Sequence, residues 1–149
     1  MKNFIFLLFC FSNILMNAQS TGNYQVKAEV LLSKFPEESD LSGKLKKLGV
    51  LNQKYEYEPY RANWIFNKDV VFLGGKILWY SETMVEEYVG CCPDPDQFGI
   101  VLQNADMKIA EDFCRKKNLK MAPFDDYIYN IPNKYQNVDK SKLIFISTN

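Results

Sequence analysis

Residues Val70–Leu102, VVFLGGKILWYSETMVEEYVGCCPDPDQFGIVL, contain the pattern that decides the fold. Two apolar runs, Val70–Leu73 and Lys76–Tyr80, are separated only by Gly74 and Gly75. Two glycines between such runs favour a tight hairpin, because both central residues of a type I′ turn need a positive φ. The sequence therefore predicts a hairpin over about residues 70–83, with the two glycines as its turn.

The register of this predicted hairpin makes both of its faces largely apolar. Leu73 faces Lys76 and Phe72 faces Ile77 when Gly74-Gly75 is the turn. A hairpin that is apolar on both faces is expected at the centre of a sheet that is covered on two sides, or at an oligomer contact. Phe98–Leu102 supplies a third strand after the loop.

The chain around the hairpin alternates between predicted strands and helices. Further strands are expected at residues 23–32, 50–58, 119–122 and 142–147, and helices at about residues 41–48 and 105–117. Residues 23–32 (NYQVKAEVLL) alternate apolar and polar side chains, which is typical of a half-buried strand. Residues 60–67 and 123–141 are expected to be connecting segments. This order predicts an α+β domain, with a mainly antiparallel sheet and both helices packed on it.

The ends of the two predicted helices also have sequence signals. Gly49 stands where a left-handed C-terminal residue belongs after the first helix. Asn104 is the expected N-cap of the second helix, and Asn118 is expected to end it. Within the second helix, Ile109, Ala110, Phe113 and Cys114 make one apolar stripe.

The first residues have the composition of a secretory signal peptide. Lys2 gives a short basic start, and Phe4–Met16 is almost wholly apolar but too short to span a bilayer comfortably. Cleavage after Ala18 would leave residues 19–149 as a single exported domain. No later apolar run is long enough to span a bilayer, so we expect a soluble product outside the cytoplasm.

The charge balance limits the classes of partner. The chain has 18 Lys+Arg against 18 Asp+Glu, and signal cleavage removes only Lys2. A nearly neutral protein is a poor fit to nucleic acid or to an anionic membrane surface. We expect another envelope macromolecule, such as a protein, as the partner; the oligomeric state is not specified by the sequence.

Catalysis is disfavoured because the chain contains no histidine. That excludes Ser/His/Asp and Cys/His hydrolases, histidine-ligated zinc, and the commonest general base near neutral pH. The sequence has no nucleotide-binding glycine motif and no EF-hand loop. We therefore expect no cofactor and favour a non-catalytic protein.

Three cysteines follow the predicted signal peptide, namely Cys91, Cys92 and Cys114. In an exported protein, a disulfide from Cys91 or Cys92 to Cys114 would tie the loop to the second helix. The alternative is a thiol-dependent redox or soft-metal-binding protein. The acidic neighbours of the cysteine pair raise a thiol pKa, which disfavours the redox role.

Acidic side chains give only a weak indication of a metal site. Asp94 and Asp96 flank Pro95 and could offer two carboxylates to Ca²⁺. Calcium needs six to eight oxygen ligands, so a solvated acidic turn is the better interpretation.

Tyrosines in polar surroundings give the strongest functional hypothesis. The residues concerned are Tyr55, Tyr57, Tyr127, Tyr129 and Tyr135. Tyrosine among polar side chains supplies binding surfaces with contact area at a low entropic cost, although such residues also complete small cores. The hypothesis is an exported module that binds a macromolecule through these residues. A second alternative is an envelope structural protein that oligomerises through the apolar hairpin.

Overall fold

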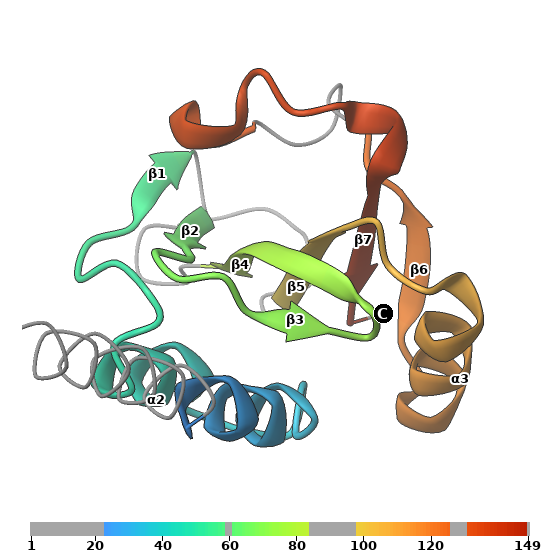
Figure 1. The fold of residues 1–149 in the computed structure, drawn as a ribbon, viewed down its shortest axis with the longest axis horizontal. Helices are drawn as coiled ribbons and strands as arrows, with labels where there is room; N and C mark the ends of the chain where they lie inside the picture. The colour runs from blue at the N-terminus through green and yellow to red at the C-terminus, as the bar shows by residue number, and fades with distance from the viewer. Residues whose placement is uncertain (1–22, 59–60, 84–97, 126–130, 149) are drawn as a thin grey trace, which may run out of the picture.

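The structure is a computed structural model that describes residues 23–58, 61–83, 98–125 and 131–148. Its strands are β1 (Glu56–Glu58), β2 (Arg61–Ile65), β3 (Val71–Phe72), β4 (Gly75–Thr83), β5 (Phe98–Gln103), β6 (Lys120–Pro123) and β7 (Leu143–Ser147). Six of them follow the order β1-β2-β4-β5-β7-β6, and β3 pairs with β4 outside this series (Figure 1). Every pairing is antiparallel, which confirms the predicted α+β fold with an antiparallel sheet.

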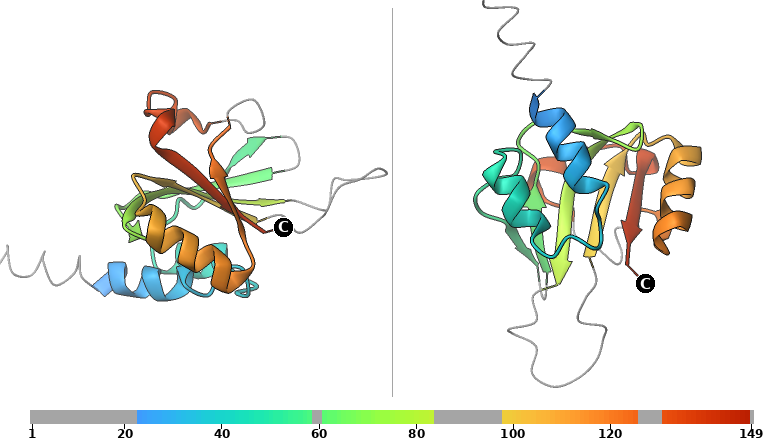
Figure 2. Two further views of the ribbon diagram at one scale, coloured as in Figure 1. Left: turned by 90° about the vertical axis from the view of Figure 1, so that its right-hand side faces the viewer. Right: turned by 90° about the horizontal axis from the view of Figure 1, so that it is seen from below.

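Helices lie on one face of the sheet, and the segment before β7 lies on the other (Figures 1 and 2). Residues 23–32 are helical, and the other helices are α2 (Leu41–Lys47) and α3 (Met107–Lys117). The 3₁₀ helices η2 (Asn133–Tyr135) and η3 (Lys140–Lys142) belong to the opposite layer. None of the helices in the described ranges is long and apolar enough to cross a membrane.

The strand predicted at residues 23–32 is wrong, because this segment is a helix. Its buried side chains follow the helical period: Ala28 and Leu32 are both 0% exposed, and Tyr24 packs against the same core. Phe35, just beyond the helix, continues that stripe. The valines that made the segment look like an alternating strand are exposed on the helix instead.

The predicted hairpin forms, but its turn lies one residue earlier than expected. Leu73 and Gly74 occupy the turn with φ values of 52° and 76°. Val71 consequently pairs with Lys76, and Phe72 pairs with Gly75. Gly75 lies in β4, and a Cβ atom there would stand 2.7 Å from backbone atoms of Ala105. Gly74 therefore serves the turn and also approaches Asp106 closely, with 2.7 Å from the position of a Cβ to the Asp106 Cβ, whereas Gly75 serves close packing alone.

The connector predicted at residues 60–67 is also wrong, since β2 crosses this segment between β1 and β4. Its polar residue Asn63 is buried and accepts a hydrogen bond from the Ser81 hydroxyl at 2.6 Å. The preceding predicted strand, residues 50–58, is reduced to β1 and an isolated bridge between Leu51 and Phe66. A paired asparagine in the core concealed the strand pattern.

The second predicted helix begins later than expected. Its N-cap is Asp106, whose side chain accepts a hydrogen bond from the Ile109 amide at 3.1 Å, and Asn104 lies outside the helix. Asn118 ends α3 in the left-handed conformation, as predicted. Ala110 and Cys114 are buried, but Ile109 is 49% exposed and does not belong to the buried stripe.

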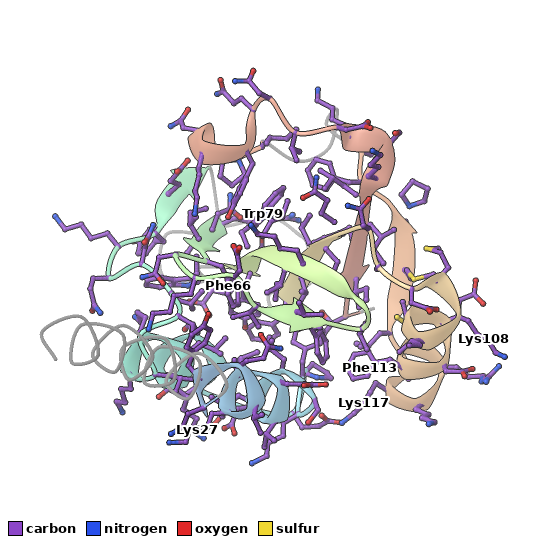
Figure 3. The ribbon with its side chains drawn as sticks, in the orientation of Figure 1. Lys27, Phe66, Trp79, Lys108, Phe113 and Lys117 are labelled. Atoms are coloured by element: carbon purple, nitrogen blue, oxygen red, sulfur yellow. The ribbon has the colours of Figure 1, made fainter. Side chains whose placement is uncertain are left out.

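Both faces of the sheet are covered within the chain. Trp79 packs against Phe124 and Tyr135 on the face opposite the helices (Figure 3). On the helical face, Phe113 of α3 meets Phe72 edge to face, with 5.3 Å between the ring centroids. This cover explains why the hairpin is apolar on both sides without requiring an oligomer contact.

Candidate binding groove

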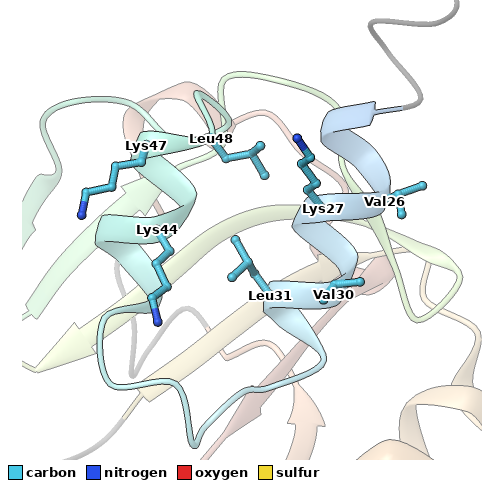
Figure 4. A pocket seen from close by; sticks show the side chains of 7 residues that line it. All are labelled: Val26, Lys27, Val30, Leu31, Lys44, Lys47 and Leu48. Carbon is cyan, nitrogen blue, oxygen red and sulfur yellow. The ribbon is translucent and has the colours of Figure 1, made fainter.

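A groove of about 520 Å³ lies between the helix over residues 23–32 and α2. The groove is defined by its lining, which consists of Val26, Lys27, Val30, Leu31, Lys44, Lys47 and Leu48 (Figure 4). Leu31 and Leu48 are half buried and pack against the core below. Val26 and Val30 are 61% and 53% exposed and lie one helical turn apart. Single exposed valines are common, but these two continue an apolar groove.

The lysines of the groove differ in their partners. Lys44 pairs with Glu38, and the hydrogen bond from its ammonium group lowers the pKa of that carboxyl. Lys27 and Lys47 form no ion pair with any of the described residues. These two ammonium groups come from different helices (Figure 4). The groove therefore combines an apolar lining with one lysine from each helix that pairs with no carboxylate of the described residues.

The wall formed by α2 is held on the sheet by polar contacts. The Ser42 hydroxyl donates to the Glu82 carboxylate at 3.3 Å, and the Trp64 indole N–H donates to the same carboxylate. Lys46 lies 3.9 Å from the centroid of the Trp64 ring, which is a cation–π geometry. The basic face of α2 is thus divided, with Lys46 fixing the helix and Lys47 lining the groove.

The wall formed by residues 23–32 is fixed in a similar way. The Gln25 side chain donates to the Val71 carbonyl at 2.7 Å and accepts from the Val71 amide at 3.0 Å. One amide side chain thereby satisfies both backbone groups of an edge residue in β3. With Ala28 and Leu32 fully buried below, this helix cannot shift without exposing core surface. The groove is consequently preformed.

The predicted tyrosine site is not brought together by the described residues. Tyr55 packs against Trp64 in the core beneath the helices, with 4.9 Å between the ring centroids. Tyr135 stacks on Trp79 in the core of the opposite face, and its hydroxyl donates to the Phe66 carbonyl at 3.3 Å. Both rings are half buried and serve packing.

The other predicted tyrosines cannot be placed in the same way. Tyr57 belongs to β1, but its side chain lies outside the description, as do residues Tyr127 and Tyr129 altogether. The tyrosine site as a whole therefore stays a prediction.

Of the three cysteines that follow the predicted signal peptide, the structure describes only Cys114. Cys114 is 5% exposed in α3, and burial raises the pKa of its thiol, which keeps it protonated and unreactive. It forms no disulfide with any described residue, while Cys91 and Cys92 lie outside the described ranges. The predicted disulfide is untested.

No metal site is found where the structure describes the chain. Groups of three or more potential ligands are absent from the described ranges, which do not include Asp94 and Asp96. The weak calcium hypothesis thus gains no support.

The chain was also compared with known proteins. No protein-family model, curated protein or solved structure matches it. The function must therefore be argued from the groove and its surroundings.

Sequence reasoning missed the groove because it placed residues 23–32 in a strand. The helical period of Tyr24, Ala28 and Leu32 was available in the sequence and leaves Val26 and Val30 off the buried stripe. Two valines one turn apart on the outer side of an amphipathic helix are the signal that would have indicated a docking surface.

Proposed function

We propose that the protein is an exported, non-catalytic binding module whose partner, another protein, docks in the groove between residues 23–32 and α2. The observation that carries this proposal is the pair of exposed valines that continues a preformed apolar groove. Apolar surface that is both exposed and contiguous is typical of interaction sites. Export remains part of the proposal and rests on the signal-peptide pattern of the first residues.

A protein fits the groove better than a small molecule. Small-molecule sites enclose about 70–90% of the surface of their ligand. This groove lies between two helices on the outside of the molecule (Figure 4), so a small apolar ligand would stay widely exposed. A protein can cover Val26 and Val30 from outside while it fills the space above Leu31 and Leu48.

The alternatives have less support. A thiol enzyme would need an accessible thiolate, and Cys114 does not supply one because it is buried and its pKa is raised. Such an enzyme would rest on Cys91 and Cys92, which lie outside the described residues. A structural role through the hairpin is not favoured by its packing, since both faces are covered within the chain. A binding surface that includes the tyrosines remains the competing location.

Site-specific photo-crosslinking tests the proposal. A photoreactive residue replaces Val30, and a matched control replaces Ile109, which is 49% exposed on α3. We expect a crosslinked partner in envelope extract from the Val30 position only, and its loss in a chain that also carries Val26→Gln. Equal crosslinking from both positions, or from neither, would contradict the groove as the docking site.

A further inference from the structure

We infer that the partner presents an acidic amphipathic helix to the groove, an inference that rests on the proposed function. The groove itself lies between two roughly parallel helical walls (Figure 4). An amphipathic helix that lays its apolar face into such a space is a recurrent mode of recognition. The apolar residues of the partner helix, which recur every three or four positions along it, would cover Val26 and Val30 and approach Leu31.

The charge around the groove selects the sign of the partner. Lys27 and Lys47 form no ion pair among the described residues. In Figure 4, Lys47 lies on the α2 side of Leu31 and Leu48, and Lys27 lies between these leucines and Val26. Acidic residues on a partner helix that fills the space above Leu31 and Leu48 would meet Lys47 along one edge and Lys27 along the other. Their attraction steers association and discriminates against basic helices.

Lys44 has a different part in this arrangement. Its ammonium group already pairs with Glu38, so only its aliphatic stem is available to extend the apolar lining. The selectivity for acidic helices is thereby assigned to Lys27 and Lys47. Because Glu38 already neutralises Lys44, the groove differs from a uniformly basic patch.

An anionic membrane surface is the main competing occupant, because lysines beside apolar side chains also suit acidic lipids. The groove argues against it. Leu31 and Leu48 are recessed between the helices, where a convex partner reaches them and a planar surface meets only the outer valines. The membrane is therefore an outcome of the test.

Peptide binding to the purified protein gives the first measurement. The probes are two synthetic helical peptides with the same leucine stripe, one flanked by glutamate and the other by lysine. We expect the glutamate peptide to bind more tightly, with an affinity that falls as salt is added. We expect Lys27→Glu with Lys47→Glu to weaken binding of the glutamate peptide by about tenfold, an order of magnitude expected for reversing two exposed charges.

Two control variants make the result specific. Lys108→Glu with Lys116→Glu makes the same change of charge on α3, away from the groove, and should leave the affinity unchanged; Lys108 points outward in Figure 3. Val26→Gln with Val30→Gln removes the exposed apolar surface without adding charge, and should abolish binding of both peptides. Circular dichroism confirms that each variant is folded.

The outcomes separate this inference from the proposed function. Equal, Val30-dependent binding of both peptides would overturn the acidic selectivity but keep the groove as a docking site. Crosslinking from Val30 without binding of either peptide would contradict a helical partner but would leave the groove as the docking site. Binding to vesicles of anionic phospholipid that Val26→Gln with Val30→Gln abolishes would overturn both in favour of a membrane. If neither peptide binds and no crosslink forms, both the acidic helical partner and the groove as a docking site are contradicted.

Discussion

Gly75 shows how one missing side chain decides the register of the central hairpin. A Cβ atom at this position would stand 2.7 Å from backbone atoms of Ala105 and from the Gln103 carbonyl oxygen. The neighbouring backbone is itself held, because the Asp106 amide donates to the Leu73 carbonyl at 2.9 Å. The sequence pattern reveals two glycines between strands, but only the strand pairing and the positive φ values show that the turn uses Leu73 and Gly74.

We expect Gly75→Ala to destabilise the protein more than Gly49→Ala does. The added methyl group at residue 75 meets fixed backbone, and such overpacking costs about 1–3 kcal/mol or more. Gly49 has a φ of 73°, but a Cβ atom there would meet only the Lys68 Nζ atom at 3.8 Å, an ordinary contact. Alanine at residue 49 therefore costs only the left-handed backbone strain of about 1–2 kcal/mol. Urea unfolding of both variants measures the difference, and a smaller loss at residue 75 would contradict the close approach.

Tyr135 gives a prediction for alkaline pH. Burial, with a smaller contribution from Asp69, raises the pKa of Tyr135 from 10.0 to about 12. Folding therefore favours the neutral phenol, so this stabilisation is complete below pH 10 and is lost as the pH rises toward 12. We expect Tyr135→Phe to remove an absorbance transition near pH 12 in the native protein. Loss of a transition near pH 10 instead would show that the ring is solvated rather than stacked on Trp79.

Elements were predicted reliably where their local signals agreed. The hairpin strands, α2 and α3 each combine an apolar pattern with a turn or cap signal, and β5 and β7 are short apolar runs. Residues 23–32 fit a period of 2 and a period of 3.6 equally well, and only the burial of Ala28 and Leu32 selects the helix. β2 was hidden because Asn63 meets Ser81 across the strands, a partnership invisible along the chain. Packing, rather than propensity, decided both elements.

The attachment of the first described helix to β3 can be tested through Gln25. Its side chain satisfies both the amide and the carbonyl of Val71. We expect Gln25→Ala to destabilise the protein by about 1 kcal/mol, because these hydrogen bonds are solvent-exposed and water partly replaces them. Hydrogen exchange should show faster loss of protection at the Val71 amide than in the unmodified protein.

A milder substitution separates the two bonds of Gln25. Gln25→Glu keeps an acceptor for the Val71 amide but replaces the donor to the Val71 carbonyl with a carboxylate oxygen. We expect it to preserve protection at the amide better than Gln25→Ala does. Equal protection at the Val71 amide in all three proteins would contradict the attachment.

At the scale of the whole molecule, the hairpin that is apolar on both faces predicted a sheet covered on both sides, and in the structure both faces of the sheet are covered. Three helices cover one face, and residues 131–142 cover the other (Figure 2). The groove could not be predicted in this way, because it depends on how far apart two helices settle on the sheet. That spacing is set by contacts such as Ser42 with Glu82, which join residues distant in sequence.

The topology also bears on the predicted disulfide between the loop cysteines and Cys114. Gly99 at the start of β5 pairs with Ser147, and Ser147 also pairs with Lys120 at the start of β6. α3 leads into β6, so Cys114 lies toward the same end of the sheet at which the chain enters β5. The six positions from Cys92 to Phe98 reach at most about 20 Å when extended, so the predicted disulfide requires Cys114 to lie within roughly that distance of the start of β5.

Intact mass of the exported protein, alkylated with and without reductant, tests the disulfide and the signal peptide together. We expect one alkylated thiol without reductant and three with it, on a chain that begins at residue 19. If Cys114 were instead unpaired, its burial and raised pKa predict slow alkylation that accelerates on unfolding. Rapid alkylation of three thiols in the native protein would contradict both the disulfide and the inert buried thiol, and would restore thiol chemistry as the competing function.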